Sequence, residues 1–356
     1  MLFLNFLLNS ILLTLSLINF ATIRRPHKSR VIEESVLVLL PVRNEAENID
    51  RILSELVEQS EIPNLSVIVI NDNSDDETAE IIKKHLSPVI SVVNAPHPPQ
   101  GWIGKVNALQ SGFLSAPRAD VVISIDADVH FEKGALASAV ATLIDTNLDF
   151  VSPYPRQIAR TWTERLVQPL LQWSWMSTVL LRGAERFPLT STVICNGQFL
   201  VMRGESLRAI DGFKSVSHKV LDDIELGRTF VESGFRGAVI DGSSIASTRM
   251  YSNLSEIKAG YGKSLHTAFG SIVGSIVAGL FIFFTGVTPL LYSLSGNLLA
   301  IASLIAIIAT RVVSAAASSG RLRDSFLHPL SSLLFIYLLY FSWSNRGKTQ
   351  WKGRTL

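Results

Sequence analysis

Three stretches of the chain lack charged side chains and are long enough to cross a lipid bilayer. Residues 1–23 contain no Asp, Glu, Lys or Arg, and neither do residues 264–310 and 325–345. A helix of about 20 residues spans the roughly 30 Å hydrocarbon core of a membrane. We therefore expect an N-terminal transmembrane anchor over residues 1–23 and a C-terminal membrane region over residues 266–345.

The C-terminal membrane region is long enough for two to three spans. Pro289 and Gly296 interrupt the first uncharged stretch, which predicts one span near residues 268–288 and another near residues 297–315. A last apolar segment covers residues 326–343. A cleaved signal peptide is the alternative for the N-terminal stretch, but it would show a basic start, a shorter apolar run and a small-residue cleavage site, and none is present.

Basic residues set the expected orientation of the anchor. Arg24, Arg25 and Lys28 directly follow the first apolar stretch, and basic flanks favour the cytoplasmic side. The domain that follows should be cytoplasmic, in a multi-pass protein of the cell (inner) membrane. Three later spans would leave the basic tail over residues 346–356 outside, so the alternative is that one segment is re-entrant or lies in the interface.

Between the membrane segments the pattern alternates between strands and helices. The predicted strands are residues 36–42, 66–70, 88–93 and 121–125, and the predicted helices are residues 44–59, 75–85, 105–115 and 132–144. Continuous apolar strands alternating with amphipathic helices predict an α/β domain with a Rossmann-like, mostly parallel sheet flanked by helices. Ligands of such sheets bind beyond the carboxyl ends of the strands.

The pattern changes after about residue 150. Residues 193–203 and 236–240 are strand-like and residues 220–233 are helical, so we place the whole domain at residues 31–265. Within it, residues 161–186 mix Trp and Leu with Arg and Glu, which favours an interfacial helix at the headgroup level. The alternative is a helix packed on the domain's own core.

Charge and cysteine content exclude several classes of protein. The net charge of +2 is too small to indicate nucleic-acid binding. Cys195 is the single cysteine, so an intrachain disulfide and a cysteine-cluster zinc site are both excluded.

Acidic residues follow the strand over residues 121–125. Asp126 and Asp128 stand at i and i+2, and on extended backbone both side chains would point the same way. Carboxylate oxygens suit a hard cation such as Mn²⁺ or Mg²⁺, which can neutralise a departing diphosphate. His130 continues the alternation and is a candidate third ligand. A pair of acidic turn residues is the alternative.

Two other strands end on polar residues. Asp72 comes directly after the second strand, where a carboxylate can accept hydrogen bonds from a base or ribose, and Pro41, Asn44 and Glu45 end the first. Glu45 also suits the first turn of a helix, where the helix dipole favours an acidic residue.

Asp222 and Asp223 open the predicted helix over residues 220–233. They either cap that helix or act as catalytic groups. A carboxylate beside a like charge has a raised pKa and can act as a general base toward an acceptor hydroxyl.

Taken together, these residues resemble family 2 glycosyltransferases with the GT-A fold, over roughly residues 35–265. The resemblance is carried by Pro41-Val42-Arg43-Asn44-Glu45, Asn71-Asp72-Asn73-Ser74-Asp75, Asp126-Ala127-Asp128 and Asp222-Asp223.

The resemblance implies a role for each of these positions. Pro41, Glu45 and Asp72 would face the nucleotide base and ribose, and Asp126 and Asp128 would serve the diphosphate and its metal. Asp223 would be the base of an inverting single displacement. Many members carry Glu-Asp where this chain has Asp222-Asp223, which leaves the role of Asp222 open.

Further features narrow the resemblance to bacterial carotenoid and hopanoid-associated glycosyltransferases. They are the motif Gly101-Trp102-Ile103-Gly104-Lys105 and the apolar segments at both ends. Lys105 is a candidate partner of the donor phosphate, the alternative being a solvated lysine at a helix start, and Arg249 is another candidate phosphate contact. The Gln-x-x-Arg-Trp motif of processive synthases is absent after Asp223, which favours transfer of one sugar from a UDP- or GDP-sugar to a membrane lipid.

The sequence leaves more than one acceptor and more than one class of protein open. A carotenoid or other isoprenoid fits the anchoring, and so do a polyprenyl phosphate and a diacylglycerol lipid. A phosphate acceptor would need further cationic residues, for which Lys214, His218 and Lys219 are candidates. Alternatives from other classes are a nucleotidyltransferase, which would need a Gly-rich basic loop after the first strand, and a non-catalytic membrane scaffold.

Overall fold

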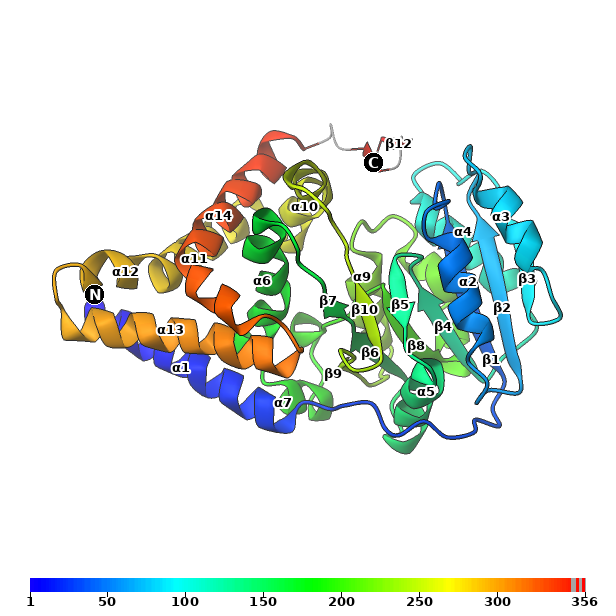
Figure 1. Ribbon diagram of the computed structural model, residues 1–356, viewed down its shortest axis with the longest axis horizontal. Helices are drawn as coiled ribbons and strands as arrows, with labels where there is room; N and C mark the ends of the chain where they lie inside the picture. Colours follow the sequence, from blue (N-terminus) through cyan, green and yellow to red (C-terminus); the bar gives the residue numbers. More distant parts are fainter. Residues whose placement is uncertain (347–349, 352–353, 356) are drawn as a thin grey trace. The chain divides into compact units, whose positions relative to one another are not determined.

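The computed structural model describes residues 1–346, 350–351 and 354–355, and the chain divides into two compact units (Figure 1). The sheet unit comprises Arg24–Arg156 and Gly183–Thr248. The membrane unit comprises Met1–Ile23, Gln157–Arg182 and Arg249–Leu356. Residues 157–182 and 249–265, which we expected within the α/β domain, therefore belong with the membrane helices.

The sheet unit is built on a seven-stranded sheet of order β3-β2-β1-β4-β8-β6-β9. Its strands are β1 (Val36–Val42), β2 (Leu65–Asn71), β3 (Ile90–Asn94), β4 (Val121–Ile125), β6 (Phe150–Tyr154), β8 (Phe199–Arg203) and β9 (Gly237–Asp241). Short strands complete the unit: β5 (Val129–Phe131), β7 (Arg156–Gln157) and β10 (Ala246–Thr248), with β5 and β10 antiparallel. The predicted α/β class is confirmed.

The direction of each strand determines which loops meet at one edge of the sheet, which we call the functional edge. β1 runs parallel to β2 and β4, with Val36 opposite both Leu65 and Val121. β8 runs antiparallel to β4, and Ile125 pairs with Phe199. The carboxyl ends of β1, β2 and β4 therefore share one edge with the residues that precede β8.

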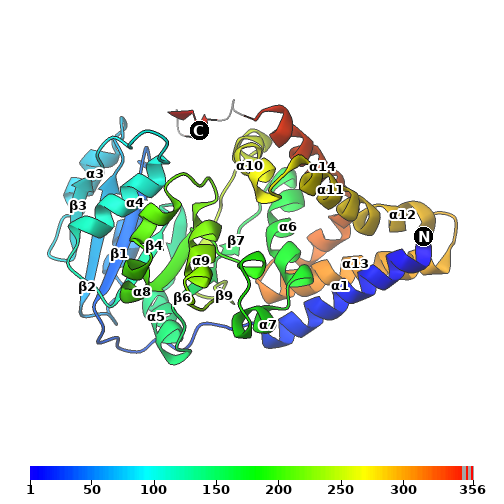
Figure 2. The same ribbon diagram turned by 180° about the vertical axis from the view of Figure 1, so that it is seen from behind.

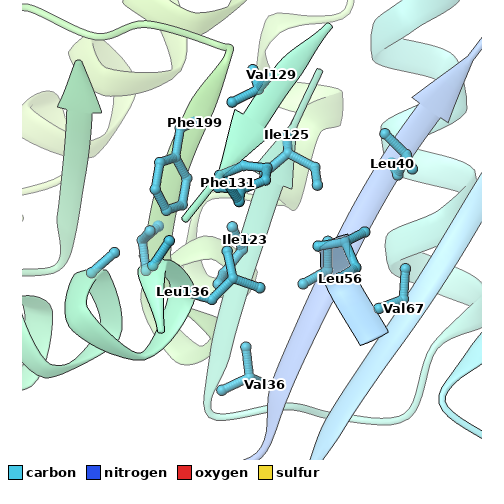
Figure 3. Packing of buried hydrophobic residues seen from close by; sticks show 14 of the residues in the cluster. Val36, Leu40, Leu56, Val67, Ile123, Ile125, Val129, Phe131, Leu136 and Phe199 are labelled. Atoms are coloured by element: carbon cyan, nitrogen blue, oxygen red, sulfur yellow. The ribbon is translucent and has the colours of Figure 1, made fainter. Parts of the chain in front are cut away.

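Helices cover both faces of the sheet because every second side chain of a strand points to the opposite face. One face carries α2 (Ile49–Val57), α3 (Thr78–His85) and α5 (Ala135–Asp145), and Figure 3 shows part of that core. The other carries α4 (Gly104–Ser115), α8 (Gly204–Ala209), η2 (Gly212–Val216) and α9 (Asp222–Glu232). α7 (Leu181–Arg186) and η1 (Thr190–Thr192) lie in the connection before β8.

The membrane unit is helical (Figure 2). Its helices are α1 (Leu2–Thr22), α6 (Trp162–Thr178), α10 (Leu254–Ala268), α11 (Ile272–Gly286), α12 (Thr288–Ser293), α13 (Leu298–Ala317), η3 (Leu322–Leu327) and α14 (His328–Ser344). Among the described residues, four segments are long and apolar enough to cross a membrane, namely Leu2–Thr22, Ile272–Ser293, Leu298–Ala317 and Leu322–Ser344. The prediction of apolar helices at both ends is confirmed.

The segment predicted to lie in the interface is α6. Its first residue, Trp162, is exposed, whereas Trp173 is buried and donates a hydrogen bond from Nε1 to Thr310 Oγ1 at 2.7 Å. α6 thus packs on other helices of the membrane unit, and its contact with headgroups stays a prediction. Of the predicted tail, β11 (Gln350–Trp351) pairs with β12 (Arg354–Thr355), and residues 347–349, 352–353 and 356 lie outside the described residues.

α1 buries four of its polar side chains and exposes many of its apolar ones. Asn5, Asn9, Ser16 and Asn19 are buried at helical spacing, while residues such as Phe3 are exposed. Asn9 Nδ2 donates to Ser303 Oγ at 2.8 Å and to the Thr285 carbonyl at 3.0 Å. Interhelical hydrogen bonds of this kind hold helices together where lipid removes the hydrophobic driving force.

This arrangement predicts that Asn9→Leu destabilises the membrane unit. The variant loses its bonds to α13 and α11, which should cost about 1 kcal/mol, and thermal unfolding of the detergent-solubilised chain would measure the change. Thr14→Val is the matched control, because Thr14 is exposed on the same helix and donates only to Ser10 within it. Equal melting of the two variants would contradict the role given to Asn9.

Candidate active site

Four carboxylates surround one lysine at the functional edge of the sheet unit. Asp126 follows β4, and its Oδ1 lies 2.5 Å from Nζ of Lys105 in the first turn of α4. Asp222 and Asp223 begin α9 and also attract the Lys105 ammonium. Burial alone would lower the pKa of Lys105, but these carboxylates raise it above its usual value. The lysine is therefore a permanent cation within the acidic cluster.

Asp223 is held by two backbone groups. The Gly197 N–H donates to Oδ2 at 2.7 Å, and the Ile224 N–H donates to Oδ1 at 2.8 Å. A Cβ atom at position 197 would lie 3.3 Å from both Asp223 Cβ and Lys105 Nζ, so glycine permits this close approach. Burial raises the pKa of Asp223, and the two N–H groups and Lys105 oppose that rise. The carboxylate is thus fixed in direction and made more basic.

The other two carboxyl groups have perturbed pKa values as well. Burial, followed by the charge of Asp126, raises the pKa of Asp128 to about 6, while the Thr248 hydroxyl donates to its Oδ2 at 3.1 Å. Burial raises the pKa of Asp222 to about 6, against the attraction of Lys105. Burial is the main cause of both shifts, and the charges of neighbouring carboxylates add to it.

The chain turns where we expected extended backbone, which changes the expected ligand set. The Val129 N–H bonds to the Asp126 carbonyl at 3.3 Å, so the alternation through Asp128 is broken. His130 lies on β5 and its Nδ1 contacts Glu55 Oε1 at 3.2 Å. Among the described residues, no group of three or more His, Cys, Asp or Glu side chains is arranged to hold a metal ion.

Asp126 and Asp128 nevertheless suit a divalent cation. Mg²⁺ and Mn²⁺ take oxygen ligands, and Mg²⁺ is commonly held by one or two carboxylates completed by substrate phosphates and water. The excess of carboxylate over ammonium charge here favours such an ion. The two aspartates therefore fit a cation that arrives with a diphosphate, and the place of His130 among its ligands stays a prediction.

The loops after β1 and β2 lock together beside this cluster. Asn44 has a left-handed φ of 52°, its N–H bonds to Ser74 Oγ at 3.1 Å, and its Oδ1 accepts from the Asp75 N–H at 3.0 Å. The Glu45 N–H donates to Thr78 Oγ1 at 2.8 Å. Asn44 therefore fixes the shape of the loop. This structural role is additional to the substrate contact that we expected, which stays a prediction.

Asp72 and Pro41 occupy the positions expected of nucleotide-binding residues in the resemblance. Asp72 is buried directly after β2, where its N–H donates to the Val42 carbonyl at 2.8 Å and its carbonyl accepts from Arg43 at 3.1 Å. Pro41 lies in β1, opposite Ile70 of β2. Their contacts with a nucleotide stay predictions.

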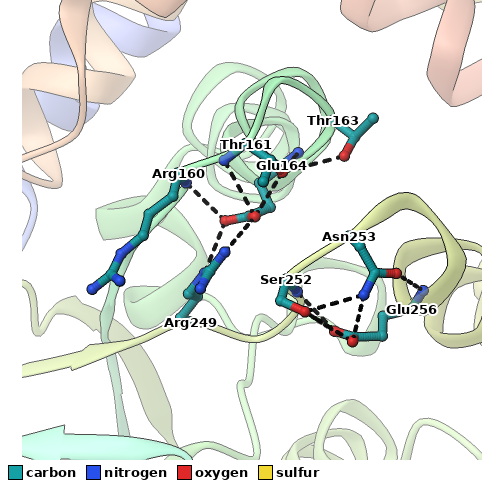
Figure 4. A network of polar contacts seen from close by, with 8 residues as sticks. All are labelled: Arg160, Thr161, Thr163, Glu164, Arg249, Ser252, Asn253 and Glu256. Atoms are coloured by element: carbon teal, nitrogen blue, oxygen red, sulfur yellow. Dashed lines mark hydrogen bonds and ion pairs between the residues drawn. The ribbon is translucent and has the colours of Figure 1, made fainter.

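Arg249 belongs to the membrane unit and is bound to Glu164 there (Figure 4). Its Nε and Nη2 donate to the fully buried Glu164 carboxylate at 3.1 and 2.8 Å. Burial alone would raise the pKa of Glu164, but the bonds from Arg249, Arg160 N and Thr161 lower it to about 2. The sequence did not reveal this ion pair. A donor phosphate, which we expected to contact Arg249, would have to compete with Glu164 for it.

Sequence reasoning missed the segment Asn196–Gln198 and Thr248. Gly197 holds Asp223, the Gln198 carbonyl accepts the Asp126 N–H at 3.3 Å, and Thr248 holds Asp128. The Asn-Gly-Gln run before an apolar strand was the available signal, but only the antiparallel direction of β8 brings it to this edge.

Comparison by sequence finds related glycosyltransferases. Residues 37–210 match the family described as glycosyl transferase family 2. A 4,4'-diaponeurosporenoate glycosyltransferase of Staphylococcus aureus (strain USA300) is 25% identical over 343 residues, covering 90% of this chain and 88% of that protein.

A solved structure shows the same fold. A mannosyltransferase from Pyrobaculum calidifontis, in complex with GDP-mannose and Mn²⁺, has a TM-score of 0.52 and 16% identity, with 98% of this chain and 100% of that chain covered. The family match, the named relative and the shared fold agree: residues 37–210 of this chain match glycosyl transferase family 2, and the chain has the GT-A fold.

Proposed function

We propose that this protein transfers one sugar, with inversion, from a nucleotide-diphosphate sugar to a lipid acceptor at the membrane, its sheet unit lying in the cytoplasm. The observation that carries the proposal is the gathering of Asp126, Asp128, Asp222 and Asp223 around Lys105. Such a cluster suits a donor that is itself anionic and brings a divalent cation with it.

The donor would be a UDP- or GDP-sugar held at the ends of β1, β2 and β4. Pro41, Glu45 and Asp72 are the proposed contacts of the base and ribose, and Asp126 and Asp128 the proposed ligands of Mn²⁺ or Mg²⁺. When bound, that ion would neutralise charge on the diphosphate as it leaves. GDP-mannose with Mn²⁺ in the Pyrobaculum enzyme supports this class of donor.

Lys105 would serve two partners in turn. Without donor it neutralises Asp126, from which it lies 2.5 Å away. With donor bound, Lys105 would turn to the phosphate oxygens, and Asp126 would then be free to hold a divalent cation. Binding of the diphosphate to Lys105 would thus release the Asp126 carboxylate from its ion pair.

Asp223 would be the base of a single displacement. The acceptor oxygen attacks the anomeric carbon, the bond from that carbon to the diphosphate breaks, and the hydroxyl proton passes to Asp223. Its raised pKa favours this proton transfer, and the N–H groups of Gly197 and Ile224 keep the carboxylate in place. Asp222, with a pKa near 6, would tune the charge beside it.

The acceptor proposed is a carotenoid or other isoprenoid. The name of the staphylococcal relative supports it, as do the four helices able to cross a membrane. Polyprenyl phosphate has less support: His218 Nδ1 already contacts the Gly101 carbonyl at 2.7 Å, and Lys219 Nζ lies 3.4 Å from Glu225. An acceptor phosphate would have to compete with these existing partners.

We expect Asp128→Ala to abolish transfer and to weaken donor binding in the presence of Mn²⁺. The physical reason is the loss of one of two carboxylates that fit the cation. Binding of a labelled nucleotide sugar to purified membranes, with and without Mn²⁺, would measure it. Glu58→Ala is a control on an exposed carboxylate. Full activity of Asp128→Ala would rule out the proposed metal site.

Asp223→Asn should retain donor binding and lose turnover. The amide keeps the shape of the side chain but cannot accept a proton. With an isoprenoid alcohol as acceptor, turnover should fall by more than about tenfold, or roughly 1.4 kcal/mol in the barrier. A smaller loss in a direct transfer assay would mean that another group is the base.

Lys105→Met should make the protein depend on a divalent cation for stability. The variant leaves four carboxylates without their ammonium, so its melting temperature should fall, and Mn²⁺ should raise it more than in the unaltered chain. Lys133→Met is the control, because that exposed lysine lies 3.5 Å from Glu58 at the surface. An equal response of both variants to Mn²⁺ would contradict the role of Lys105.

A further inference from the structure

Two basic side chains lie buried in the membrane unit without hydrogen-bond partners among the described residues. Arg311 of α13 is 2% exposed, and its Nη1 and Nη2 have no partner. His328, the first residue of α14, is fully buried, and neither ring nitrogen has a partner. Both residues lie within segments long and apolar enough to cross a membrane.

The two side chains occupy the same end of the helical bundle. Arg311 lies six residues before the end of α13 at Ala317, and η3 connects that end to His328. Arg311 is within electrostatic range of both His328 and Asp324 of η3.

Asp324 is already engaged by other arginines. Its Oδ1 accepts from Arg165 Nε at 2.8 Å and from Nη2 at 2.5 Å, and its Oδ2 lies 3.7 Å from Arg321 Nε. No ion pair within 4 Å joins Arg311 to it among the described contacts. Three guanidinium groups therefore share one carboxylate, and this end of the bundle has an excess of positive charge.

The remaining polar groups here also favour an anion. Ser325 and Ser331 carry buried hydroxyls without partners, and the first turn of the long helix α14 presents its positive dipole end. The ring of Trp173 lies 4.7 Å from that of His328 and forms an apolar wall.

A buried charge of this kind has a measurable cost. Removing a guanidinium from water costs several kcal/mol unless a counter-charge and hydrogen bonds offset it, and ionisable residues within membrane segments usually mark a functional site. The missing partner is an anion with acceptor oxygens. Within segments that face lipid, such an anion comes on an amphiphile.

We propose that Arg311 and His328 form a binding site for the anionic headgroup, carboxylate or phosphate, of a membrane lipid. The unpartnered hydroxyls of Ser325 and Ser331, which lie in η3 and in the first turn of α14, are the further donors that this proposal includes. This site goes beyond the proposed sugar transfer, because it makes the membrane unit a selective receptor for charged lipids whichever acceptor the sheet unit uses.

The test uses the full chain in a neutral detergent at pH 8 and follows thermal unfolding with added lipid. Oleate is compared with oleyl alcohol, and dioleoyl phosphatidic acid with dioleoyl phosphatidylcholine, so that each pair differs mainly in charge. The anionic member should raise the melting temperature and the neutral member should not. The response to oleate against that to phosphatidic acid distinguishes the two headgroup sources.

Two arginine variants locate the effect. Arg311→Met should weaken binding of the anionic lipid by at least about tenfold, while its melting temperature without lipid stays equal or rises because an unpaired buried charge is gone. Arg321→Met, at an arginine whose side chain is 56% exposed, is the matched control and should change affinity less than about twofold.

Several outcomes would overturn the proposal. One is that oleate stabilises the chain no more than oleyl alcohol, and phosphatidic acid no more than phosphatidylcholine. Another is that Arg311→Met binds the anionic lipid as tightly as the unaltered chain. Inorganic phosphate acting as strongly as phosphatidic acid would refute the lipid part. If Arg311→Met fails to fold, the charge selectivity of the unaltered chain and the retained affinity expected of Arg311→Lys still decide the question. Asp223→Asn should bind the lipid normally, so loss of transfer and loss of this site are distinguishable.

Discussion

The ion pair between Lys105 and Asp126 is the interaction on which the site depends. Four carboxylates brought together out of water repel one another, and burial together with this repulsion raises the pKa values of Asp128 and Asp222. One ammonium offsets part of the repulsion. The remaining negative charge costs stability but favours the binding of a divalent cation, which a fully neutralised cluster would bind weakly. The same charge that costs stability therefore creates the affinity.

The direction of β8 explains how distant segments reach this cluster. In a wholly parallel sheet, the residues before β8 would lie at the opposite edge from Asp126. Because β8 is antiparallel to β4, Asn196–Gln198 reach the edge where β4 ends. Backbone groups of that segment then fix both Asp126 and Asp223. Carboxylates from two parts of the chain are thus aligned by one loop.

Much of the sheet unit could be predicted from the sequence because its strands are continuous apolar runs. β1 and β4 have the predicted bounds, and Asp126, Asp128 and Asp223 lie in one cluster as expected. The contact of Lys105 with a phosphate stays a prediction, and the structure adds an ion pair with Asp126 that the sequence did not indicate. His130 was placed by an alternation that the turn at residues 127–128 breaks. Hydrophobic periodicity predicts neither the contact of Lys105 with Asp126 nor that of His130 with Glu55, because each depends on a turn or on a residue far along the chain.

The helices of the membrane unit could be predicted from their apolar composition, but the polar contacts between them could not. Apolar runs mark helices, yet Asn5, Asn9 and Asn19 of α1 are buried while many of its apolar residues are exposed, the reverse of a soluble helix. Partner positions such as Ser303 lie nearly three hundred residues away and leave no local pattern. The same interior holds Arg311, whose charge within an apolar run was visible, while its lack of a partner was not.

The chemistry of the acceptor determines how much work Asp223 must do. A hydroxyl must lose a proton as it attacks, so a buried carboxylate of raised pKa is needed to receive it. A carboxylate acceptor is already ionised near neutral pH and needs no base. It would, however, be repelled by the acidic cluster unless a cation neutralised that cluster first. Asp223 would then act mainly by positioning, and Lys105 with the divalent ion would carry the electrostatic burden of bringing two anions together.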